Sequence, residues 1–532
     1  MESYGAIKNV DSRSADDRRA NEILERTTVH KDGRYHVGML WSEDDPELPN
    51  NYFSALAQFK SLERRLGKDP ELSTSYAKTI SEDLAKGYVV KIDNPQDPQQ
   101  RSKTEWYLPH HPVLNPNKPG KVRRVLNGAA KFRGTSLNNS LLTGPDLLQN
   151  LIHVLLRFRQ HEFAVSADIE GMFLQVGVLE KDQPCLQFLW REDPSKNIEV
   201  YQYTRHIFGA KDSPTCANFA LQKTARDNAL KYPDAAQAVY DKFYMDDYLD
   251  SVDSKEQALL RSKQLVEMLQ LGGFRLTKFV SNVSGLLGEL EDKSNDSHAK
   301  TFSIASSPEP SSHVLGLKWD HENDTLVVSR GTSCDTEECV TQRLVLSLVS
   351  KVFDPIGLVA PFTVTARLLL KDIWRVSGQQ WDTPLADEFV DRFRAWSADL
   401  PKLCELTIPR SYFTGPFEDL ELHVFGDSSQ DVFSAVAFLR ARVHACTEVA
   451  FVIGKARVAP MKTLTVPKLE LQAAVLAARL SIDIRDALTI PVRQLFMWTD
   501  STTVLQWLSS LDKQPIFVAN RVSEILETTS AD

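Results

Sequence analysis

Two adjacent carboxylates, Asp246 and Asp247, are the residues of this sequence best suited to hold a metal ion. They lie in the segment Phe243-Tyr244-Met245-Asp246-Asp247-Tyr248-Leu249, whose apolar and aromatic residues are a poor composition for a solvated loop. Tyr and Phe favour strands, and Met-Asp-Asp fits the tight turn of a hairpin. Because side chains alternate along a strand, both carboxylates can face one cation only at a turn. An acidic surface turn is the commoner explanation of a lone Asp-Asp pair, so the metal site needs further carboxylates.

A further carboxylate lies near the end of an apolar strand far upstream. The run from Phe163 to Phe173 carries Asp168, then Gly171, and has an aromatic residue, Phe173, five positions after the aspartate. Two strands that each deliver carboxylates to one place would make a site for a divalent cation, because hard cations prefer oxygen ligands on rigid elements.

A basic segment without acidic residues lies between Asn115 and Gly134. Pro119-Gly120 supplies a turn, and Val122 and Val125 indicate strands on its far side. A basic β-hairpin suits a triphosphate or a nucleic-acid backbone, because each contact neutralises a phosphate. An exposed basic loop is an equally good explanation of this segment taken alone. Its basic residues are Lys118, Lys121, Arg123, Arg124, Lys131 and Arg133.

The remaining elements of this region follow in a recognisable order. Phe208 to Pro214 leads into an apolar helix over 215–230, and a second helix covers 256–271 after the Asp-Asp hairpin. Gly272-Gly273-Phe274 then precedes a strand with Lys278, and a last strand pair contains Val314 to Trp319.

This order resembles the palm of a reverse transcriptase, and specifically the BEL/Pao group of long-terminal-repeat retrotransposons. Three segments narrow the resemblance to that group, and it runs from about residue 12 to the end of the chain. The segments are Lys131-Phe132-Arg133-Gly134-Thr135-Ser136-Leu137-Asn138-Asn139, Phe353-Asp354-Pro355-Ile356-Gly357-Leu358 and Phe517-Val518-Ala519-Asn520-Arg521-Val522.

The resemblance implies an RNA-directed DNA polymerase that copies an RNA template into DNA. Nucleotidyl transfer needs an activated 3′-hydroxyl and a neutralised pyrophosphate, and two Mg²⁺ ions supply both. Asp168 and Asp246 are the expected bridging ligands, and Asp247 completes the acidic cluster. Lys278 is expected near the leaving pyrophosphate, where it can act as an acid. The implied partners are an RNA template, a DNA or tRNA primer, deoxynucleoside triphosphates and the RNA–DNA hybrid.

The resemblance also implies the residues that bind the incoming nucleotide. Arg123 matches the fingers arginine that holds the triphosphate, and Lys121 is a weaker candidate for the same task. Phe173 matches the aromatic gate that leaves no room for a ribose 2′-hydroxyl. Gly209, Ser213 and Pro214 complete the expected substrate-binding set.

Two positions depart from the usual pattern of these motifs. Asn127 stands where the fingers motif usually carries an aspartate, and Asp212 stands where a small or neutral residue is commoner. Neither position is an expected metal ligand, so the departures bear on activity rather than on fold.

The last part of the chain carries three more acids at element ends. Asp427 ends the strand 422–427, Glu470 lies near the start of a helix that opens at Pro467, and Asp500 ends the strand 495–500. This pattern resembles a ribonuclease H domain with these three acids as ligands of two further Mg²⁺ ions. The fold normally has a fourth acid on a later helix, and the chain stops at Asp532 before that segment. We therefore expect a fragment starting near residue 415 to cleave hybrids weakly.

Family catalogues give the region after the palm a peptidase label, which the sequence does not support. An aspartic protease needs Asp-Ser/Thr-Gly, and Asp427-Ser428-Ser429 and Asp500-Ser501-Thr502 both lack the glycine. The helical stretch 340–415 is instead expected to be the thumb and connection.

Composition sets the frame for these expectations. A length of 532 residues fits three or four domains, and we expect an α+β chain. Its parts are a polar, partly disordered lead-in with a helical segment (1–95), fingers and palm (96–325), thumb and connection (326–415), and a truncated α/β ribonuclease H-like domain (416–532). Residues 94–100 are an expected linker, and 291–312 an expected mobile insertion.

Charge and cysteine usage bound the function classes. The net charge of −9 argues weakly against nucleic-acid binding, but such a footprint is local. No signal peptide and no run of 18 apolar residues is present, so we expect no membrane partner and a location in the cytoplasm. The resemblance to retrotransposons implies virus-like particles and access to the nucleus. Six scattered cysteines predict reduced, mostly buried thiols rather than zinc or disulfides.

A second interpretation of the whole chain stays open. A degenerate or host-adopted retroelement copy would bind nucleic acid without catalysis. Intact Asp168, Asp246, Asp247 and Arg123 favour the enzyme. The missing C-terminal segment and the absent capsid, protease and integrase parts favour the relic.

Overall fold

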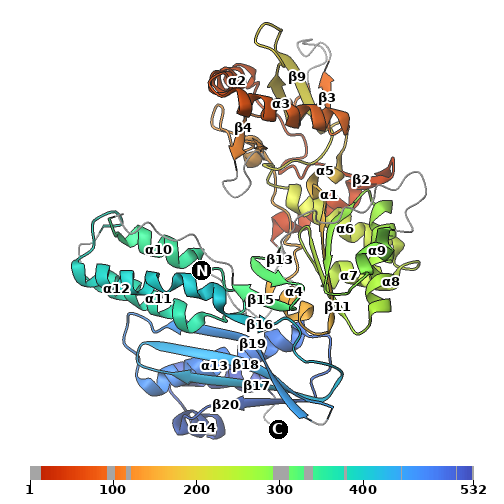
Figure 1. Cartoon of the computed structure of the whole chain (residues 1–532). Helices are drawn as coiled ribbons and strands as arrows, with labels where there is room; N and C mark the ends of the chain where they lie inside the picture. The colour runs from red at the N-terminus through yellow and green to blue at the C-terminus, as the bar shows by residue number, and fades with distance from the viewer. Residues whose placement is uncertain are drawn as a thin grey trace. The chain divides into compact units, whose positions relative to one another are not determined.

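The computed structural model describes residues 14–92, 102–114, 122–291, 311–328, 339–376, 380–444, 446–510 and 512–529. The chain divides into two compact units, and helices and strands occur in both (Figure 1). The first unit comprises Met1–Leu148, Ile169–Tyr240 and Arg261–Thr277. The second comprises Gln149–Asp168, Asp241–Leu260 and Lys278–Asp532. The predicted linker and most of the predicted insertion lie outside the described residues.

The strands of the first unit form three small sheets. The sheet orders are β1-β2-β7, β3-β9-β8 and the hairpin β4-β5, whose strands flank the predicted basic turn. The bounds are β1 Val29–Lys31, β2 Arg34–Val37, β3 Val89–Ile92, β4 His110–Leu114, β5 Val122–Leu126, β7 Gly177–Val178, β8 Gln187–Trp190 and β9 Glu199–Tyr203.

Helices cover these sheets. The helical segment expected within residues 1–95 includes α2, on which Phe53 is 82% exposed. The helices lying wholly or largely in this unit are α1 Ala15–Thr27, α2 Tyr52–Leu66, α3 Pro70–Ala85, η1 Leu137–Ser140, α5 Met172–Gln175, η2 Gln183–Leu186, α6 Ser213–Asn228, α7 Pro233–Asp241 and α8 Lys255–Leu271.

The predicted disordered lead-in is wrong for the described residues from 14 onward. Ser14 and Asp17 form a reciprocal capping box that starts α1, and the helix buries Ala20, Ile23 and Leu24. Polar composition hid this helix because only one narrow face of it is apolar.

The second unit contains a four-stranded sheet in the order β10-β11-β6-β12. Its strands are β6 Phe163–Ile169, β10 Phe243–Tyr244, β11 Asp247–Val252 and β12 Leu276–Ser281; β6 and β12 each run a short way into the first unit. β11 pairs antiparallel with both β10 and β6, and helix α4 (Leu151–Phe158) packs on β11.

A second sheet and several helices follow, mostly where thumb and connection are predicted. The sheet order is β13-β14-β15-β16, and α11 packs on both α10 and α12. The bounds are α9 Leu286–Glu291, β13 Ser311–Val314, β14 Leu317–Asp320, β15 Thr325–Val328, α10 Gln342–Lys351, α11 Ala360–Arg375, α12 Asp387–Ala398, η3 Leu400–Glu405 and β16 Thr407–Pro409.

A third sheet and its helices complete the second unit, in blue in Figure 1. The order is β19-β18-β17-β20, with β20 parallel to β17. Helix α13 packs on β17 and β18, α11 packs on β19, and α14 and α15 pack on α13. The bounds are β17 Phe417–Ser428, β18 Val432–Val443, β19 Cys446–Val458, α13 Val466–Ala487, β20 Gln494–Trp498, α14 Thr502–Ser509 and α15 Ile516–Thr528.

One continuous hydrophobic core runs through the second unit. It includes Leu155 of α4, Trp319 of β14, Leu369 of α11 and Leu422 of β17, all at most 2% exposed. The helices of 342–398 therefore share a core with the last sheet.

Three buried arginines of the second unit, which we call the arginine joint, tie α4 and the turn after it to the segments around the last sheet. The joint consists of Arg157, Arg159 and Arg410. Arg157 donates from Nε to the Ala487 carbonyl (2.7 Å), and Arg159 donates from Nη1 to the Val452 carbonyl (3.2 Å).

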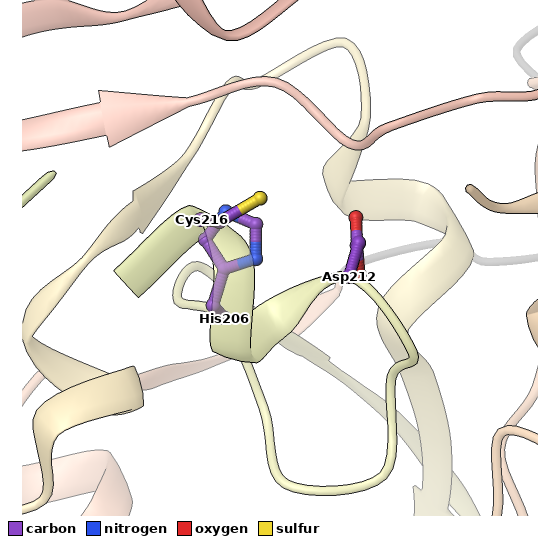
Figure 2. A group of neighbouring side chains, drawn as sticks. All are labelled: His206, Asp212 and Cys216. Atoms are coloured by element: carbon purple, nitrogen blue, oxygen red, sulfur yellow. The ribbon is translucent and has the colours of Figure 1, made fainter. Parts of the chain in front are cut away.

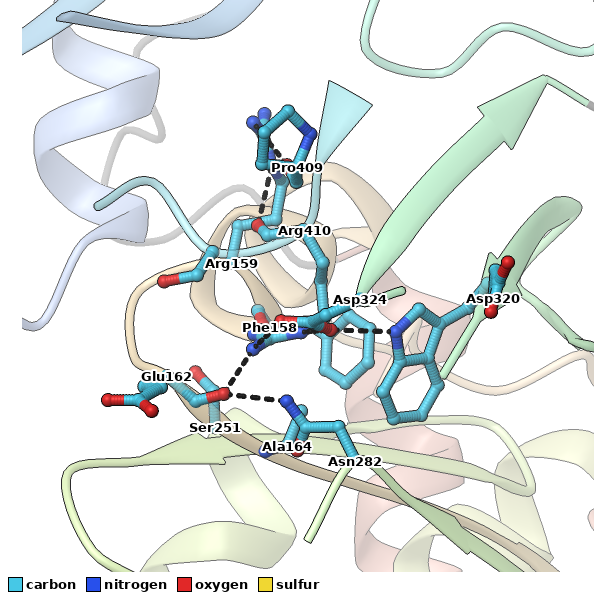
Figure 3. Close-up of polar contacts among 12 residues, drawn as sticks. Phe158, Arg159, Glu162, Ala164, Ser251, Asn282, Asp320, Asp324, Pro409 and Arg410 are labelled. Atoms are coloured by element: carbon cyan, nitrogen blue, oxygen red, sulfur yellow. Dashed lines mark hydrogen bonds and ion pairs between the residues drawn. The ribbon is translucent and has the colours of Figure 1, made fainter. Parts of the chain in front are cut away.

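Arg410 lies at the centre of the arginine joint and has no solvent exposure. It binds Asp324 through Nε (2.6 Å) and Nη2 (2.8 Å), and donates from Nη1 and Nη2 to three backbone carbonyls of 158–162 (Figure 3). All of its donors are used, as a buried guanidinium requires.

The segment 353–358 is a close backbone crossing against β19. Gly357 has φ +72°, and a Cβ there would lie 1.8 Å from the Gly454 carbonyl oxygen. Gly454 donates its N–H to the Ile356 carbonyl (2.8 Å). Asp354 accepts from the N–H groups of Leu358 and Val359 at the start of α11. This conspicuous motif is thus structural.

The prediction of mostly buried thiols is wrong for the described cysteines. Cys185 and Cys216 are buried, but Cys339, Cys404 and Cys446 are exposed; Cys334 lies outside the described residues. None of these five forms a disulfide. Among the described helices, none has the length and apolar character needed to cross a membrane.

Candidate active sites

The Asp-Asp segment folds as a tight hairpin in the second unit. Phe243 pairs with Tyr248 and Tyr244 with Asp247, so Met245 and Asp246 form a two-residue turn. Met245 has φ +55°, the left-handed conformation such a turn requires. Because Asp246 lies in the turn, its side chain and that of Asp247 need not point to opposite faces, as consecutive residues of a regular strand do.

The strand pairing brings the upstream acid to this hairpin. Asp168 of β6 is the register partner of Asp247 of β11. Lys278, on β12 with φ +56°, forms an ion pair with Asp168 Oδ2. The four predicted residues Asp168, Asp246, Asp247 and Lys278 therefore lie at the same end of one sheet.

Crowded negative charge perturbs the two hairpin acids. Burial, followed by the charges of Asp246 and Asp168, raises the pKa of Asp247 to about 7. Burial also raises the pKa of Asp246, and the charge of Asp168 adds to that. A cation between the carboxylates would relieve this repulsion.

A neighbouring acid, Asp250, is not part of this cluster. Its carboxylate is buried beside Lys242 Nζ (3.3 Å) and accepts from the Tyr248 hydroxyl (3.0 Å). The sheet thus separates a neutralised structural aspartate from the acids at the turn.

The expected nucleotide-binding residues lie in the first unit. Arg123 of β5 is exposed, whereas the next residue, Arg124, is buried against Asp83 and Tyr203 and is not available to a phosphate. Phe173 is half-buried, and its ring centroid lies 4.6 Å from that of Phe208. Lys118 and Lys121 lie outside the described residues.

The loop before α6 is held by Asn138, a residue of the predicted 131–139 motif. Asn138 donates from Nδ2 to the Gly209 carbonyl (3.0 Å) and accepts from the Lys211 N–H (3.0 Å). Gly209 has φ +114°, and a Cβ there would lie 2.1 Å from the Leu126 carbonyl oxygen. Sequence reasoning gave Asn138 no contact, because its partners are 71 and 73 residues away.

Ser213 and Pro214 open α6 rather than a loop. Ser213 is fully buried, and Pro214 is in the first turn, where its missing N–H costs nothing. Of the two departures from the pattern, Asn127 is exposed and accepts from the Ala129 N–H (3.1 Å), whereas Asp212 is fully buried.

A second acidic cluster lies on the last sheet of the second unit. Asp427 of β17, Glu470 of α13 and Asp500, just after β20, have carboxylate oxygens within 4.8 Å of one another. Gly426 permits this, because a Cβ there would lie 3.0 Å from the Ala473 carbonyl oxygen of α13. Burial, followed by the neighbouring acids, raises the pKa of Glu470, and its Oε2 has no hydrogen-bond partner.

Ligand spacing differs between the two acidic sites. Among the described residues, the two groups of three or more His, Cys, Asp or Glu side chains with ligand atoms within 4.8 Å are Asp427/Glu470/Asp500 and His206/Asp212/Cys216. Asp168, Asp246 and Asp247 are not such a group, and Lys278 occupies one carboxylate of that site.

A family model described as the Pao retrotransposon-like RNaseH-like domain matches residues 341–501. The match includes α10 to α12 as well as the last sheet, in agreement with their shared core. Its description names RNaseH-like structure, which agrees with the absence of a protease motif. None of the curated proteins compared with the sequence matches it.

Two solved structures show the fold. The foamy viral protease-reverse transcriptase dRH in complex with double-stranded DNA is 14% identical, with a TM-score of 0.52 over 85% of this chain and 67% of that one. The foamy viral protease-reverse transcriptase in complex with an RNA/DNA hybrid is 13% identical, with a TM-score of 0.52 over 97% of this chain and 59% of that one. This chain thus spans about two thirds of the first structure's chain and less than two thirds of the second's.

The family match and the structural neighbours confirm the resemblance drawn from the motifs. The chain has the fold of the reverse transcriptases to which it is similar, and its residues 341–501 match the Pao retrotransposon-like RNaseH-like domain family.

Proposed function

We propose that this chain is an RNA-directed DNA polymerase of a retrotransposon that acts by two-metal nucleotidyl transfer. The observation that carries the proposal is the β6–β11 pairing, which sets Asp168 opposite Asp247 and beside the Asp246 turn. A structural hairpin would not need three acids at one end of a sheet, where burial and the charges of Asp246 and Asp168 raise the pKa of Asp247.

The donor set fits Mg²⁺. All three ligands are hard carboxylate oxygens on strands or a tight turn, the type that Mg²⁺ prefers. When bound, two Mg²⁺ ions supply activation of the primer hydroxyl and neutralisation of the departing pyrophosphate. Lys278 already contacts Asp168, so a cation on Asp168 would free the lysine ammonium for the leaving group.

Primer extension on poly(rA)/oligo(dT) with Mg²⁺ tests the proposal. Asp246→Asn removes one charge at the turn and should abolish extension. Asp253→Asn is the matched control, because Asp253 is a 78% exposed aspartate beyond β11 that pairs with His161 rather than with the cluster. Equal extension by wild type and Asp246→Asn would reject the proposal.

The ribonuclease part of the proposal depends on Asp427, Glu470 and Asp500. Their cluster can hold divalent cations for hydrolysis of the RNA strand of a hybrid, a substrate recognised by shape and 2′-hydroxyls. Glu470→Gln in the full chain should remove Mg²⁺-dependent hybrid cleavage, while Glu388→Gln, an exposed acid in the first turn of α12, should not. Cleavage that survives Glu470→Gln would contradict this part.

The same experiments separate the alternative of a non-catalytic retroelement copy. In that case the wild type and the Asp246→Asn variant would bind a primer–template duplex equally well, and neither would extend the primer. Binding without extension in the wild type would therefore favour the alternative.

A further inference from the structure

A buried cluster in the first unit combines three different metal-ligand types. His206 and Cys216 have 0% exposure, as does Asp212. Their ligand atoms all lie within 4.8 Å of one another (Figure 2). Asp212 and Cys216 are four residues apart across the first turn of α6, joined by the Cys216 N–H to Asp212 carbonyl bond (3.0 Å), so their side chains share one face. None of the expected catalytic residues belongs to this cluster.

His206 is oriented as a metal-ligating histidine would be. Its Nε2 lies 3.4 Å from the Val37 carbonyl oxygen, so Nε2 carries the proton and donates it. The lone pair is then on Nδ1, which is buried and has no hydrogen-bond partner. Metal-bound histidines typically have this arrangement, with the second ring nitrogen donating to a backbone carbonyl.

Asp212 resembles His206 in that one of its two polar side-chain atoms is hydrogen-bonded and the other is not. Its Oδ2 accepts from the Leu40 N–H (3.0 Å), while Oδ1 is buried without a partner. An unsatisfied buried carboxylate oxygen costs free energy, so native structures rarely keep one.

The surroundings of the cluster are negative rather than positive. A second buried carboxylate, Asp182, is close enough to oppose ionisation of both Asp212 and Cys216. Asp182 is held by the Met39 N–H (3.1 Å) and by Trp41 Nε1 (3.0 Å), which are neutral donors. The Lys211 side chain next to Asp212 is exposed. Two buried carboxylates whose hydrogen-bond donors among the described residues are the neutral N–H groups of Met39, Leu40 and Trp41 favour a bound cation.

We propose that His206, Asp212 and Cys216 bind one Zn²⁺ ion in the first unit. One nitrogen, one oxygen and one sulfur ligand suit zinc better than Mg²⁺ or Ca²⁺, which take oxygen ligands. Tetrahedral zinc with bonds of about 2.0–2.3 Å places its ligands roughly 3.3–3.7 Å apart, so side-chain movements of about 1 Å would close the site. Water can take the fourth position, and binding releases the Cys216 thiol proton.

The proposed zinc ion would fasten the loop before α6 to the strand end after β2. His206 and Asp212 bracket Phe208 and Gly209, and both contact the 37–40 segment through Val37 and Leu40. The Asp212 carboxylate occupies a buried position that an apolar side chain would otherwise fill. A structural ion here would supply the stabilisation that apolar packing cannot. The buried aspartate at this unusual position is then explained as a ligand.

Metal analysis of the full chain tests the proposal. Protein loaded with Zn²⁺ and dialysed should keep one zinc per chain by mass spectrometry, and Co²⁺-loaded protein should show a thiolate-to-cobalt charge-transfer band. Cys216→Ala and Asp212→Asn should lose both signals. Cys404→Ala is the control, since Cys404 is an exposed thiol of the second unit, and it should keep both.

The cobalt band separates this site from the carboxylate sites, which contain no sulfur. Circular dichroism establishes whether each variant is folded. If Cys216→Ala unfolds, Asp212→Asn takes its place in the test, because the asparagine side-chain oxygen still accepts from the Leu40 N–H. A wild-type chain without the charge-transfer band, or an equal band in folded Cys216→Ala, would overturn the proposal. Loss of primer extension would not affect it, because the site shares no residue with the polymerase acids.

Discussion

Single residues in this chain show how burial decides the state of a titratable group. His110 is buried in the first unit, where Nε2 donates to the Leu189 carbonyl (2.9 Å) and Nδ1 lies 2.5 Å from the Tyr76 hydroxyl. The rings of Tyr76 and Phe188 lie within 6 Å of it. Burial lowers the pKa of His110 to about 4, so the ring is neutral at pH 7.

This histidine predicts a loss of stability in mild acid. The folded-state pKa of about 4 lies below the unfolded value of 6.5, so the unfolded chain binds the proton first. The stability is complete above pH 6.5 and falls as the pH drops toward 4. At pH 5 the loss from His110 is about 2 kcal/mol. Urea unfolding at pH 7.5 and 5 should show a smaller pH dependence in His110→Gln, while His111→Gln, an exposed neighbour, should match wild type.

Phe173 predicts the choice of sugar, if the chain polymerises DNA. Phe173→Val should admit ribonucleotides, with selectivity reduced about tenfold or more, equivalent to about 1.4 kcal/mol. Phe208→Leu should give a smaller change, because Phe208 supports the Phe173 ring. Primer extension with ribo- and deoxynucleotides measures the ratio, and an unchanged ratio in Phe173→Val would disprove the gate.

The types and order of the acids could be predicted from the sequence, but their contacts could not. The sequence places Asp168 at a strand end and Asp246 in a turn, and the fold supplies the pairing. The sequence could not show that Lys278 contacts Asp168 or that the Arg124 side chain is buried. Neighbouring residues on a strand point to opposite faces of the sheet, and the sequence does not say which face is buried. His206 and Cys216 were not connected, since neither is in a recognised metal motif.

At the scale of elements, strands and helices that carry a recognisable motif could be predicted from the sequence. Elements with a mostly polar sequence could not. The sequence pattern of residues 243–249 predicted the strand-turn-strand of β10 and β11. Sequence patterns missed α1, whose narrow apolar face lies within a charged sequence, and the role of the 353–358 segment. The sequence gives that segment no contact, yet its Gly357 is required by a close backbone approach to Gly454, 97 residues away.

The Gly357 crossing predicts a specific loss of stability. Gly357→Ala should destabilise the second unit by roughly 2–5 kcal/mol, from a left-handed conformation and a clash with a backbone oxygen. Gly285→Ala is the matched control: it has φ +82° in the same unit with nothing within 4 Å, and should cost roughly 1–2 kcal/mol. Thermal unfolding compares them, and equal costs would show that the crossing does not matter.

At the scale of the whole chain, the domain boundaries are the least predictable feature. The sequence predicts thumb and connection apart from the ribonuclease H-like domain, whereas the core joins α10 to α12 with the last sheet. The first and second units also alternate along the chain. Neither feature has a local signature, because both depend on contacts between residues far apart in sequence.

The arginine joint predicts a large dependence on one buried ion pair. Arg410→Lys should destabilise the second unit by about 3–5 kcal/mol, since an ammonium cannot replace the fork that binds Asp324 and three carbonyls. Arg343→Lys breaks a similar two-bond pair with Asp382 at an exposed site and should cost at most about 1 kcal/mol. Urea unfolding measures both; a small loss in Arg410→Lys would contradict the role of the joint.

The arginine joint also bears on the spacing between the two acidic clusters of the second unit. Asp246 and Glu470 belong to one unit with one core, and the arginine joint links α4, which packs on β11, to residues at the end of α13. If both clusters act on the same hybrid, the RNA strand is cut a constant number of nucleotides behind the growing DNA end. A substitution that weakens the arginine joint would then broaden the distribution of RNA fragment lengths before it slowed either reaction.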